Sequence, residues 1–142
     1  MSMAIFVDTW GWVALFDAAN EDHVATSRFV RKAFGDGENL VTTNFVLCET
    51  ITLLFGRLGP ENGVRFLDDL QAMRSLPQYA AEEITPERFE KGLSFRRRYR
   101  DKPDISFTDL TTMVVMRELG ITDILTGDKH FRQVNLGFRR VP

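Results

Sequence analysis

Four acidic side chains occupy positions from which a folded α/β chain can bring them together. Two of them follow short apolar segments, since Asp8 comes directly after residues 4–7 and Asp128 comes soon after 121–125. A short apolar run that ends abruptly is typical of a strand buried on both faces of a parallel sheet. The carboxyl ends of parallel strands meet at one edge, where open α/β sheets bind their ligands. We therefore expect Asp8 and Asp128 to lie at the same edge.

The other two acids belong to predicted helices. Asp109 is the third residue after Ser106, a spacing that matches a capping box and places Asp109 in the first turn of a helix. Glu49 lies in a largely apolar helical segment, where a carboxylate is costly to bury without a cation or a hydrogen-bond partner. Each acid also has a structural interpretation as a turn former, a helix-dipole partner or an exposed residue. Their joint placement favours a shared site.

The available ligand atoms favour a hard divalent cation. The chain has one cysteine, Cys48, and two histidines that are not paired, which excludes an intrachain disulfide and every multi-cysteine zinc site. Carboxylate oxygens suit Mg²⁺ or Mn²⁺. Such an ion polarises a phosphoryl oxygen and lowers the pKa of its bound water. The predicted metal ligands are Asp8, Glu49, Asp109 and Asp128, whereas Cys48 is expected to pack in the core.

Strands and helices alternate along the chain and must position these acids. The apolar runs and their flanking turn residues predict strands at 4–7, 40–43, 79–84, 121–125 and 137–141. Capping residues and helix-breaking residues predict helices at about 10–18, 23–35, 44–58, 61–73, 86–99 and 106–119. Asn44 is the predicted N-cap of the third helix, which is expected to end at Gly59. This alternation favours a three-layer α/β/α sandwich around a four- or five-stranded, mostly parallel sheet.

Length and composition bound the class of protein. The 142 residues fit one domain, and a chain with 44% hydrophobic and 27% charged residues is typical of a globular fold. No apolar run approaches the roughly 20 residues needed to cross a bilayer, and the N-terminus lacks the pattern of a signal peptide. We therefore expect a single cytoplasmic domain over 1–142 with no membrane partner. The sequence also lacks the Gly-rich Gly-Lys-Ser/Thr motif that binds phosphate, which excludes a P-loop NTPase.

Charge is divided unevenly along the chain. Residues 1–90 have seven Lys or Arg and fourteen Asp or Glu, a net charge of −7, whereas residues 91–142 have eleven and six, a net charge of +5. Such a split is typical of a basic anion-binding surface, but a solvated basic helix face gives the same count. Both interpretations stay open on composition alone.

Four segments around the acids resemble the PIN-domain ribonucleases, and within them the VapC toxins of bacterial type II toxin–antitoxin systems. They occur in the family's order and spacing, and they are 6–9 (FVDT), 44–50 (NFVLCET), 104–109 (DISFTD) and 125–131 (LTGDKHF). The resemblance extends over essentially the whole chain. It implies a catalytic, metal-binding role for Asp8, Glu49, Asp109 and Asp128. It implies auxiliary roles for Thr9, Asp104 and Thr126. Gly127 departs from the family, in which a bulkier residue is frequent at this position, and we expect it to loosen the backbone.

The activity implied by the resemblance is metal-dependent hydrolysis of RNA phosphodiester bonds by an activated water. The protein would be the toxin of a toxin–antitoxin pair that acts on structured tRNA or rRNA loops, with an antitoxin partner and a homodimeric state. Basic residues are then expected to bind RNA phosphates, namely Arg96, Arg97, Arg98, Arg100, Lys102, Lys129 and Arg132. Trp10 and Trp12 could stack an unpaired base, although we favour packing in the core or at a dimer contact.

Two other functions remain alternatives at the level of sequence. One is a PIN nuclease of RNA processing outside any toxin pair, which a neighbouring antitoxin reading frame would distinguish. The other is a non-catalytic, receiver-like binding module that uses one acid at a strand end. A receiver needs paired acids near its first strand, and Asp8 has no acidic neighbour, which counts against this class.

Overall fold

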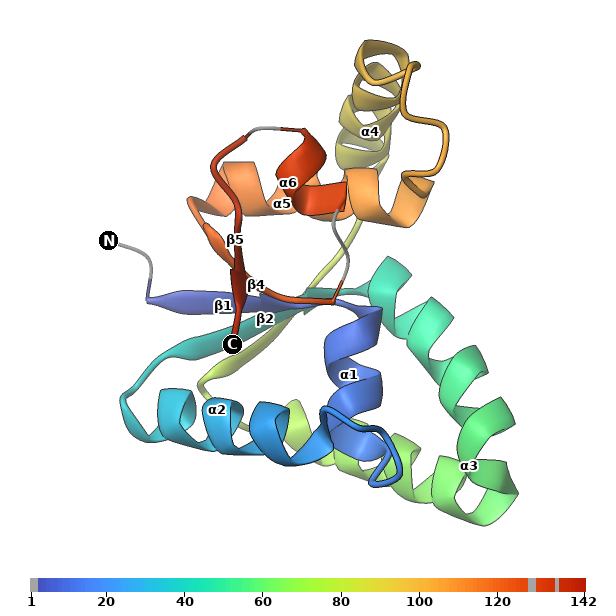
Figure 1. Ribbon diagram of the computed structural model, residues 1–142, viewed down its shortest axis with the longest axis vertical. Coiled ribbons are helices and arrows are strands. Elements are labelled where there is room, and N and C mark those ends of the chain that lie inside the picture. Colours follow the sequence, from blue (N-terminus) through green and yellow to red (C-terminus); the bar gives the residue numbers. More distant parts are fainter. Residues whose placement is uncertain (1–2, 128–129, 135) are drawn as a thin grey trace.

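Five short strands form one parallel sheet in this structure, a computed structural model that describes residues 3–127, 130–134 and 136–142 (Figure 1). The strand order is β3-β2-β1-β4-β5, and every neighbouring pair is parallel. The strands are β1 (Ala4–Val7), β2 (Asn39–Thr43), β3 (Tyr79–Glu82), β4 (Asp123–Leu125) and β5 (Arg139–Val141). All five predicted strands are therefore present, the last three shorter than expected.

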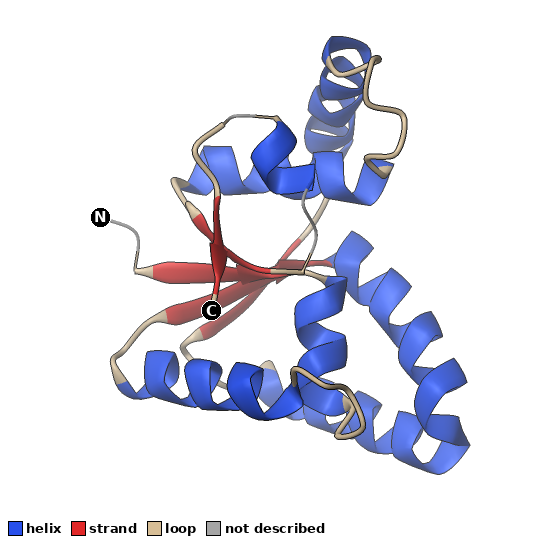
Figure 2. Cartoon of the chain, viewed as in Figure 1, coloured by secondary structure: helices blue, strands red, loops and turns tan. Residues whose placement is uncertain are grey.

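Helices cover both faces of this sheet (Figures 1 and 2). On one face lie α1 (Thr9–Phe16), α2 (His23–Gly35) and α3 (Asn44–Met73). On the other lie α4 (Pro86–Arg98), α5 (Phe107–Leu119) and the short α6 (His130–Gln133), which was not predicted. The predicted three-layer α/β/α sandwich is confirmed. Within the described residues, no helix combines the length and the apolar character needed to span a membrane.

The direction in which strands are added to the sheet reverses at β1. The chain adds β2 and β3 on one side of β1, and β4 and β5 on the other. The register pairs Val7 with Leu125, and the Asp8 N–H donates to the Leu125 carbonyl at 3.4 Å. Such a reversal opens a crevice at the carboxyl ends of the strands, where open α/β sheets bind their ligands. Asp8 stands at this crevice, as its position after a buried strand predicted.

The N-terminus of α5 is held by the predicted cap. Ser106 Oγ accepts a hydrogen bond from the Asp109 N–H at 3.0 Å. At the other end Gly120 adopts the left-handed conformation, with a φ of +68°, and terminates the helix. Both ends of α5 therefore lie where the sequence predicted them, and Asp109 occupies the first turn.

The start of α3 differs from the prediction by one residue. The cap is Thr43, whose Oγ1 accepts from the Val46 N–H at 3.2 Å, and not Asn44. Asn44 Oδ1 instead accepts the N–H of Ile84 at 2.7 Å, which ties α3 to the segment after β3. The predicted break at Gly59 is confirmed, because its φ of +80° and ψ of 172° interrupt the helical geometry and α3 changes direction there (Figure 1).

The position of α1 on the sheet depends on Gly11 and Trp12. A Cβ added at Gly11 would stand 2.7 Å from the Leu125 carbonyl oxygen, so only glycine lets α1 approach β4 this closely. Trp12 is 1% exposed, and its Nε1 donates to Thr42 Oγ1 at 3.2 Å. The preference for packing over base stacking is therefore correct for Trp12, which anchors the helix that follows Asp8.

Candidate active site

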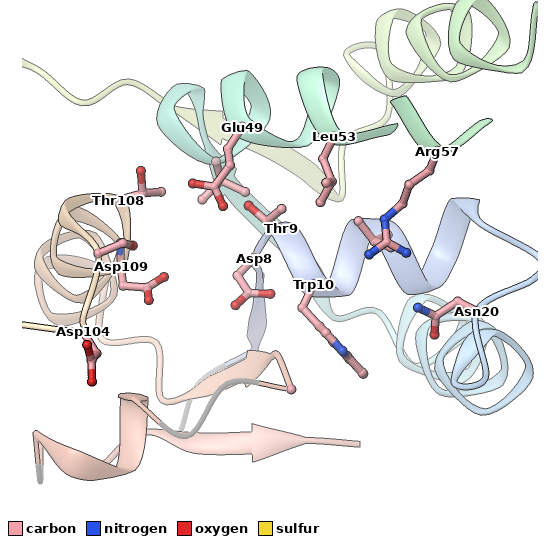
Figure 3. Close-up of a pocket in the computed structure, with 14 residues that line it drawn as sticks. Asp8, Thr9, Trp10, Asn20, Glu49, Leu53, Arg57, Asp104, Thr108 and Asp109 are labelled. Atoms are coloured by element: carbon pink, nitrogen blue, oxygen red, sulfur yellow. The ribbon is translucent and has the colours of Figure 1, made fainter. Parts of the chain in front are cut away.

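A cavity of about 610 Å³ opens where α1, the first arm of α3 and the start of α5 meet (Figure 3). Four acidic side chains from separate segments of the chain line it: Asp8, Glu49, Asp104 and Asp109. The fold thus brings together three of the four predicted metal ligands and the auxiliary Asp104. The fourth predicted ligand, Asp128, lies outside the described residues, as does Lys129.

Asp8 is the most buried of these four acids, with 6% of its surface exposed. Its Oδ1 accepts a hydrogen bond from the Gly11 N–H at 3.1 Å, so the carboxylate caps α1 while it lines the cavity. Burial of a carboxylate is costly unless hydrogen bonds or charges compensate it. The backbone donor and the positive end of the α1 dipole supply part of that compensation.

Glu49 and Asp109 reach the cavity from two other walls (Figure 3). Glu49 is exposed on α3, whereas Val46 and Thr50 on the same helix are buried. The burial cost expected from its apolar surroundings therefore does not arise, because the side chain points into the cavity. Asp109 is half-buried in the first turn of α5, where the helix N-terminus stabilises a negative charge.

The three auxiliary residues differ in their positions. Thr9, the first residue of α1, lines the cavity directly after Asp8 in the chain. Asp104 is exposed and contributes to the same lining from the loop before α5. Thr126 follows β4 and is 4% exposed, and in the described structure it is not among the residues that line the cavity.

Sequence reasoning missed the residues at the far end of the cavity. Arg57 and Asn20 line it there, with Trp10 between them and Asp8 in the view of Figure 3. Among the described residues, Arg57 is the one cation in the lining. A signal was present in the sequence, because Arg57 lies eight residues after Glu49 on one helix and therefore on the same face, with Leu53 between them.

Gly127 has a packing role that the sequence did not predict. A Cβ at this position would stand 2.6 Å from Trp10 Nε1, so the indole occupies the space that a side chain would need. The Gly127 carbonyl also accepts from Arg140 at 3.0 Å. We expected Gly127 to loosen the backbone. The structure gives a steric reason for glycine at this position, namely the close approach of Trp10.

The basic residues at the end of α4 divide into two groups. The Arg96 guanidinium donates to three backbone carbonyls, those of Tyr99 at 2.9 Å, Lys102 at 2.7 Å and Ile105 at 2.5 Å. It therefore braces the turn between α4 and α5. Arg97, Arg98 and Arg100 are exposed. Within the described residues, none of these basic side chains lines the cavity. The side chain of Arg132 lies outside the described part of the structure.

Lys102 is paired within the same turn. Its Nζ lies 3.0 Å from an Asp101 carboxylate oxygen and 5.9 Å from the centre of the Tyr99 ring. The hydrogen bond from Lys102 lowers the pKa of Asp101 below its ordinary value. The accessible positive charge of this turn is therefore carried mainly by the three exposed arginines.

The prediction that Cys48 packs in the core is wrong. The thiol is free and exposed. Cys48 lines a neighbouring cavity with Phe45 and Leu53. On the same helix the buried positions are Val46 and Thr50, so Cys48 lies outside the buried face.

The chemistry of the lining side chains fits a hard divalent cation. All four acids offer carboxylate oxygens, the ligands that Mg²⁺ and Mn²⁺ prefer. Across 3–127, 130–134 and 136–142, no three acidic, histidine or cysteine side chains already stand together as a formed metal cluster. The four acids therefore have the ligand type that a divalent cation prefers, and they line the same cavity.

Comparisons with known proteins agree with this architecture. The model of the PIN domain family matches residues 5–136. The chain is 32% identical over 127 residues to the 23S rRNA-specific endonuclease VapC20 of two strains of Mycobacterium tuberculosis. The aligned region covers 89% of this chain and 91% of the relative.

A solved structure leads to the same family. The crystal structure of M. tuberculosis VapC20, described as a sarcin–ricin loop cleaving toxin, superposes with a TM-score of 0.81 at 32% identity, over 96% of this chain and 98% of that one. These matches leave no room for the receiver-like alternative. PIN-domain nucleases generally use divalent metals, which agrees with the acidic cavity near the end of β1, where the direction of strand addition reverses. The chain belongs to the PIN domain family, as a metal-dependent endoribonuclease of the VapC toxin type.

Proposed function

We propose that this protein is a toxin that cleaves 23S rRNA at the sarcin–ricin loop. The observation that carries the proposal is an acidic cavity in a chain that matches an rRNA-cleaving toxin over almost its entire length. RNA is recognised with sequence specificity mainly at unpaired, exposed bases, which loops present. This choice narrows the broader class of structured tRNA and rRNA loops that the sequence suggested.

In the proposed site Asp8, Glu49, Asp109 and Asp128 hold one or two Mg²⁺ or Mn²⁺ ions. The bound ion would supply a polarised phosphoryl oxygen and an acidified water. Asp8 keeps its orientation through the Gly11 N–H, and Asp109 keeps its own through the capped start of α5. Thr9 offers a hydroxyl to the substrate phosphate. Asp104 supports the acids from the cavity lining, and Thr126 supports them from the end of β4.

The partners of the protein follow from the same assignment. VapC toxins pair with VapB antitoxins and bind RNA, and we propose a cognate antitoxin and a homodimer for this chain. The proposed place of action is the cytoplasm, where ribosomes are, without a membrane partner. We assign the whole of 1–142 to one nuclease domain.

Intact ribosomes provide the test of the substrate. Purified protein with Mg²⁺ should produce a single new 23S rRNA end in the sarcin–ricin loop, mapped by primer extension, while an Asp8→Asn protein purified in parallel should produce none. Total tRNA serves as the competing substrate. If tRNA is cleaved and 23S rRNA stays intact, the proposed substrate is wrong but the ribonuclease activity is retained. If neither RNA is cleaved, the proposed ribonuclease activity itself is wrong.

The basic turn gives a separate prediction about RNA affinity. Replacing Arg97 and Arg98 together with Gln should weaken RNA binding and reduce the slope of log affinity against log salt by about 0.7 per lost phosphate contact. Arg96→Gln should leave the slope near the wild-type value but lower stability, because three carbonyls lose their donor. Binding is measured by titration at several salt concentrations. If the salt slope becomes flatter in Arg96→Gln and not in the Arg97 and Arg98 double variant, Arg96 binds RNA and the other two arginines do not.

A further inference from the structure

Trp10, Arg57 and Asn20 form one end of the active-site cavity, apart from its acidic residues. In Figure 3 they lie on the side of Asp8 opposite to Asp109 and Asp104. The cavity is therefore longer than the group of acids requires, and its second end combines an aromatic ring, a cation and an amide. These are the groups that bind a base and a phosphate.

The Trp10 indole is held in place and is also accessible. It packs against the edge of the core and lies over Gly127, where a Cβ would come within 2.6 Å of its Nε1. The ring is nevertheless only half-buried and lines the cavity, in contrast to Trp12, which is 1% exposed. A fixed aromatic surface beside a phosphodiester-cleaving site is suited to stack an unpaired base.

Arg57 supplies the positive charge at this end. It extends from α3, and its guanidinium lies 3.7 Å from a carboxylate oxygen of Asp17. Asp17 is only 14% exposed at its side chain, whereas Arg57 is 49% exposed, so the pair orients Arg57 from one side and leaves it accessible from the cavity. A guanidinium has five N–H donors and binds phosphate bidentately.

The loop between α1 and α2 holds Asp17, the ion-pair partner of Arg57, and the nearby Asn20. Asp17 Oδ1 accepts from the Ala19 N–H at 3.1 Å, and Asn20 Oδ1 accepts from the Asp22 N–H at 2.9 Å. The carboxamide of Asn20 is thereby oriented with its oxygen engaged by the backbone. This geometry supports a preformed subsite whose parts come from α1, the following loop and α3.

We propose that Trp10 and Arg57 form a nucleotide subsite next to the acids, in which Trp10 stacks an unpaired base of the RNA and Arg57 binds the adjoining phosphate. The inference rests on the proposed RNA cleavage. It accounts for the cation in an otherwise acidic cavity, and it gives the enzyme a way to select a base that has left its helix. Asn20 is positioned to contribute a hydrogen bond to the same nucleotide.

Tryptophan fluorescence tests the stacking directly, because the chain has two tryptophans and Trp12 is buried. The Asp8→Asn protein, in which we expect no cleavage, is titrated with a short single-stranded oligoribonucleotide that matches the sarcin–ricin loop sequence. Emission should be quenched as the oligonucleotide binds. In Asp8→Asn combined with Trp10→Leu, the remaining Trp12 emission should not change, and anisotropy of a labelled oligonucleotide should report about tenfold weaker binding.

Conservative and control variants separate binding from packing. Trp10→Phe keeps a ring and should restore part of the affinity that Trp10→Leu loses. Arg57→Gln should weaken binding about tenfold, whereas Arg65→Gln, which removes the same charge from an exposed position of α3 outside this cavity, should have little effect. Thermal unfolding of each variant confirms that it is folded.

In cleavage assays the subsite variants should raise KM more than they lower kcat, because their contacts form in the bound ground state. Unchanged Trp10 emission on binding, absence of oligonucleotide binding, or equal affinities of Arg57→Gln and Arg65→Gln would overturn the subsite. If the wild-type protein still cleaves 23S rRNA in those cases, the subsite alone fails. If it cleaves no RNA, the failure lies in the proposed function.

Discussion

Asp8→Asn is expected to abolish RNA cleavage without destabilising the protein. Asn retains an Oδ1 that can accept the Gly11 N–H, and Asn is as good an N-cap as Asp, so the start of α1 is preserved. The substitution removes one negative charge from a cavity lined by four acids, which reduces their repulsion. The metal-free protein should therefore be as stable as the wild type or more stable. Loss of a metal ligand is expected to reduce the rate by a factor on the order of 10³, or several kcal/mol.

Asp8→Ala provides the comparison that separates the two roles of this carboxylate. Ala cannot accept the Gly11 N–H, so this variant should lose about 1 kcal/mol of stability in addition to its activity. Denaturant unfolding in a chelating buffer and cleavage rates per folded molecule measure the two effects. An Asp8→Asn protein that cuts RNA at the wild-type rate would show that Asp8 only caps the helix.

The sequence was sufficient to predict all the elements of this fold except α6. The central strand β1 is a short apolar run that ends at a polar residue, and most helices carry recognisable caps, whereas β3 (YAAE) and β5 (RRV) have no such apolar pattern. It was not sufficient to choose between adjacent capping residues. Thr43 and Asn44 are both good N-caps, and the choice depends on the N–H of Ile84, which is distant in the chain and needs the Asn44 carboxamide. Strand order likewise depends on packing between segments that no local pattern specifies.

The predicted part of the site consists of residues whose positions follow from local rules. Asp8 ends a buried strand and Asp109 follows a capping serine, so topology alone brings them to one edge. Arg57 was not predicted, because it lies in the acidic part of the chain whereas charge patterning points to the basic part for RNA contacts. Its helical spacing from Glu49 was the better guide.

Cys48 shows the limit of composition as a guide to burial. A free cysteine is most often buried, and this one directly follows an apolar stretch of the helix. The buried face of this part of α3 is nevertheless set by Val46, Thr50 and Leu54, which follow each other at intervals of four residues. Cys48 lies outside that row, so helical periodicity predicts its exposure where residue type does not.

Removal of divalent cations is expected to have an effect as large as the loss of Asp8. RNA cleavage should stop in excess EDTA and return when Mg²⁺ or Mn²⁺ is added, because the cavity offers carboxylate oxygens and no sulfur ligand from the described lining. Binding to the folded state alone should also stabilise the wild-type protein, by about 2.7 kcal/mol at a concentration of one hundred times Kd. Thermal unfolding with and without the ion measures this gain independently of activity.

The Asp8→Asn protein serves as the control for both measurements. If Asp8 is a ligand, the ion should raise the Tm of this variant less than that of the wild type at every concentration, because one carboxylate of the set is missing and the affinity is lower. Cleavage that persists in EDTA with wild-type protein but is absent with Asp8→Asn would mean that these acids act without a metal. Cleavage that persists equally in both preparations would identify a contaminating nuclease. An equal Tm shift in both proteins, by contrast, would place the ion away from Asp8 and would require a different set of ligands for the chemistry at the end of β1.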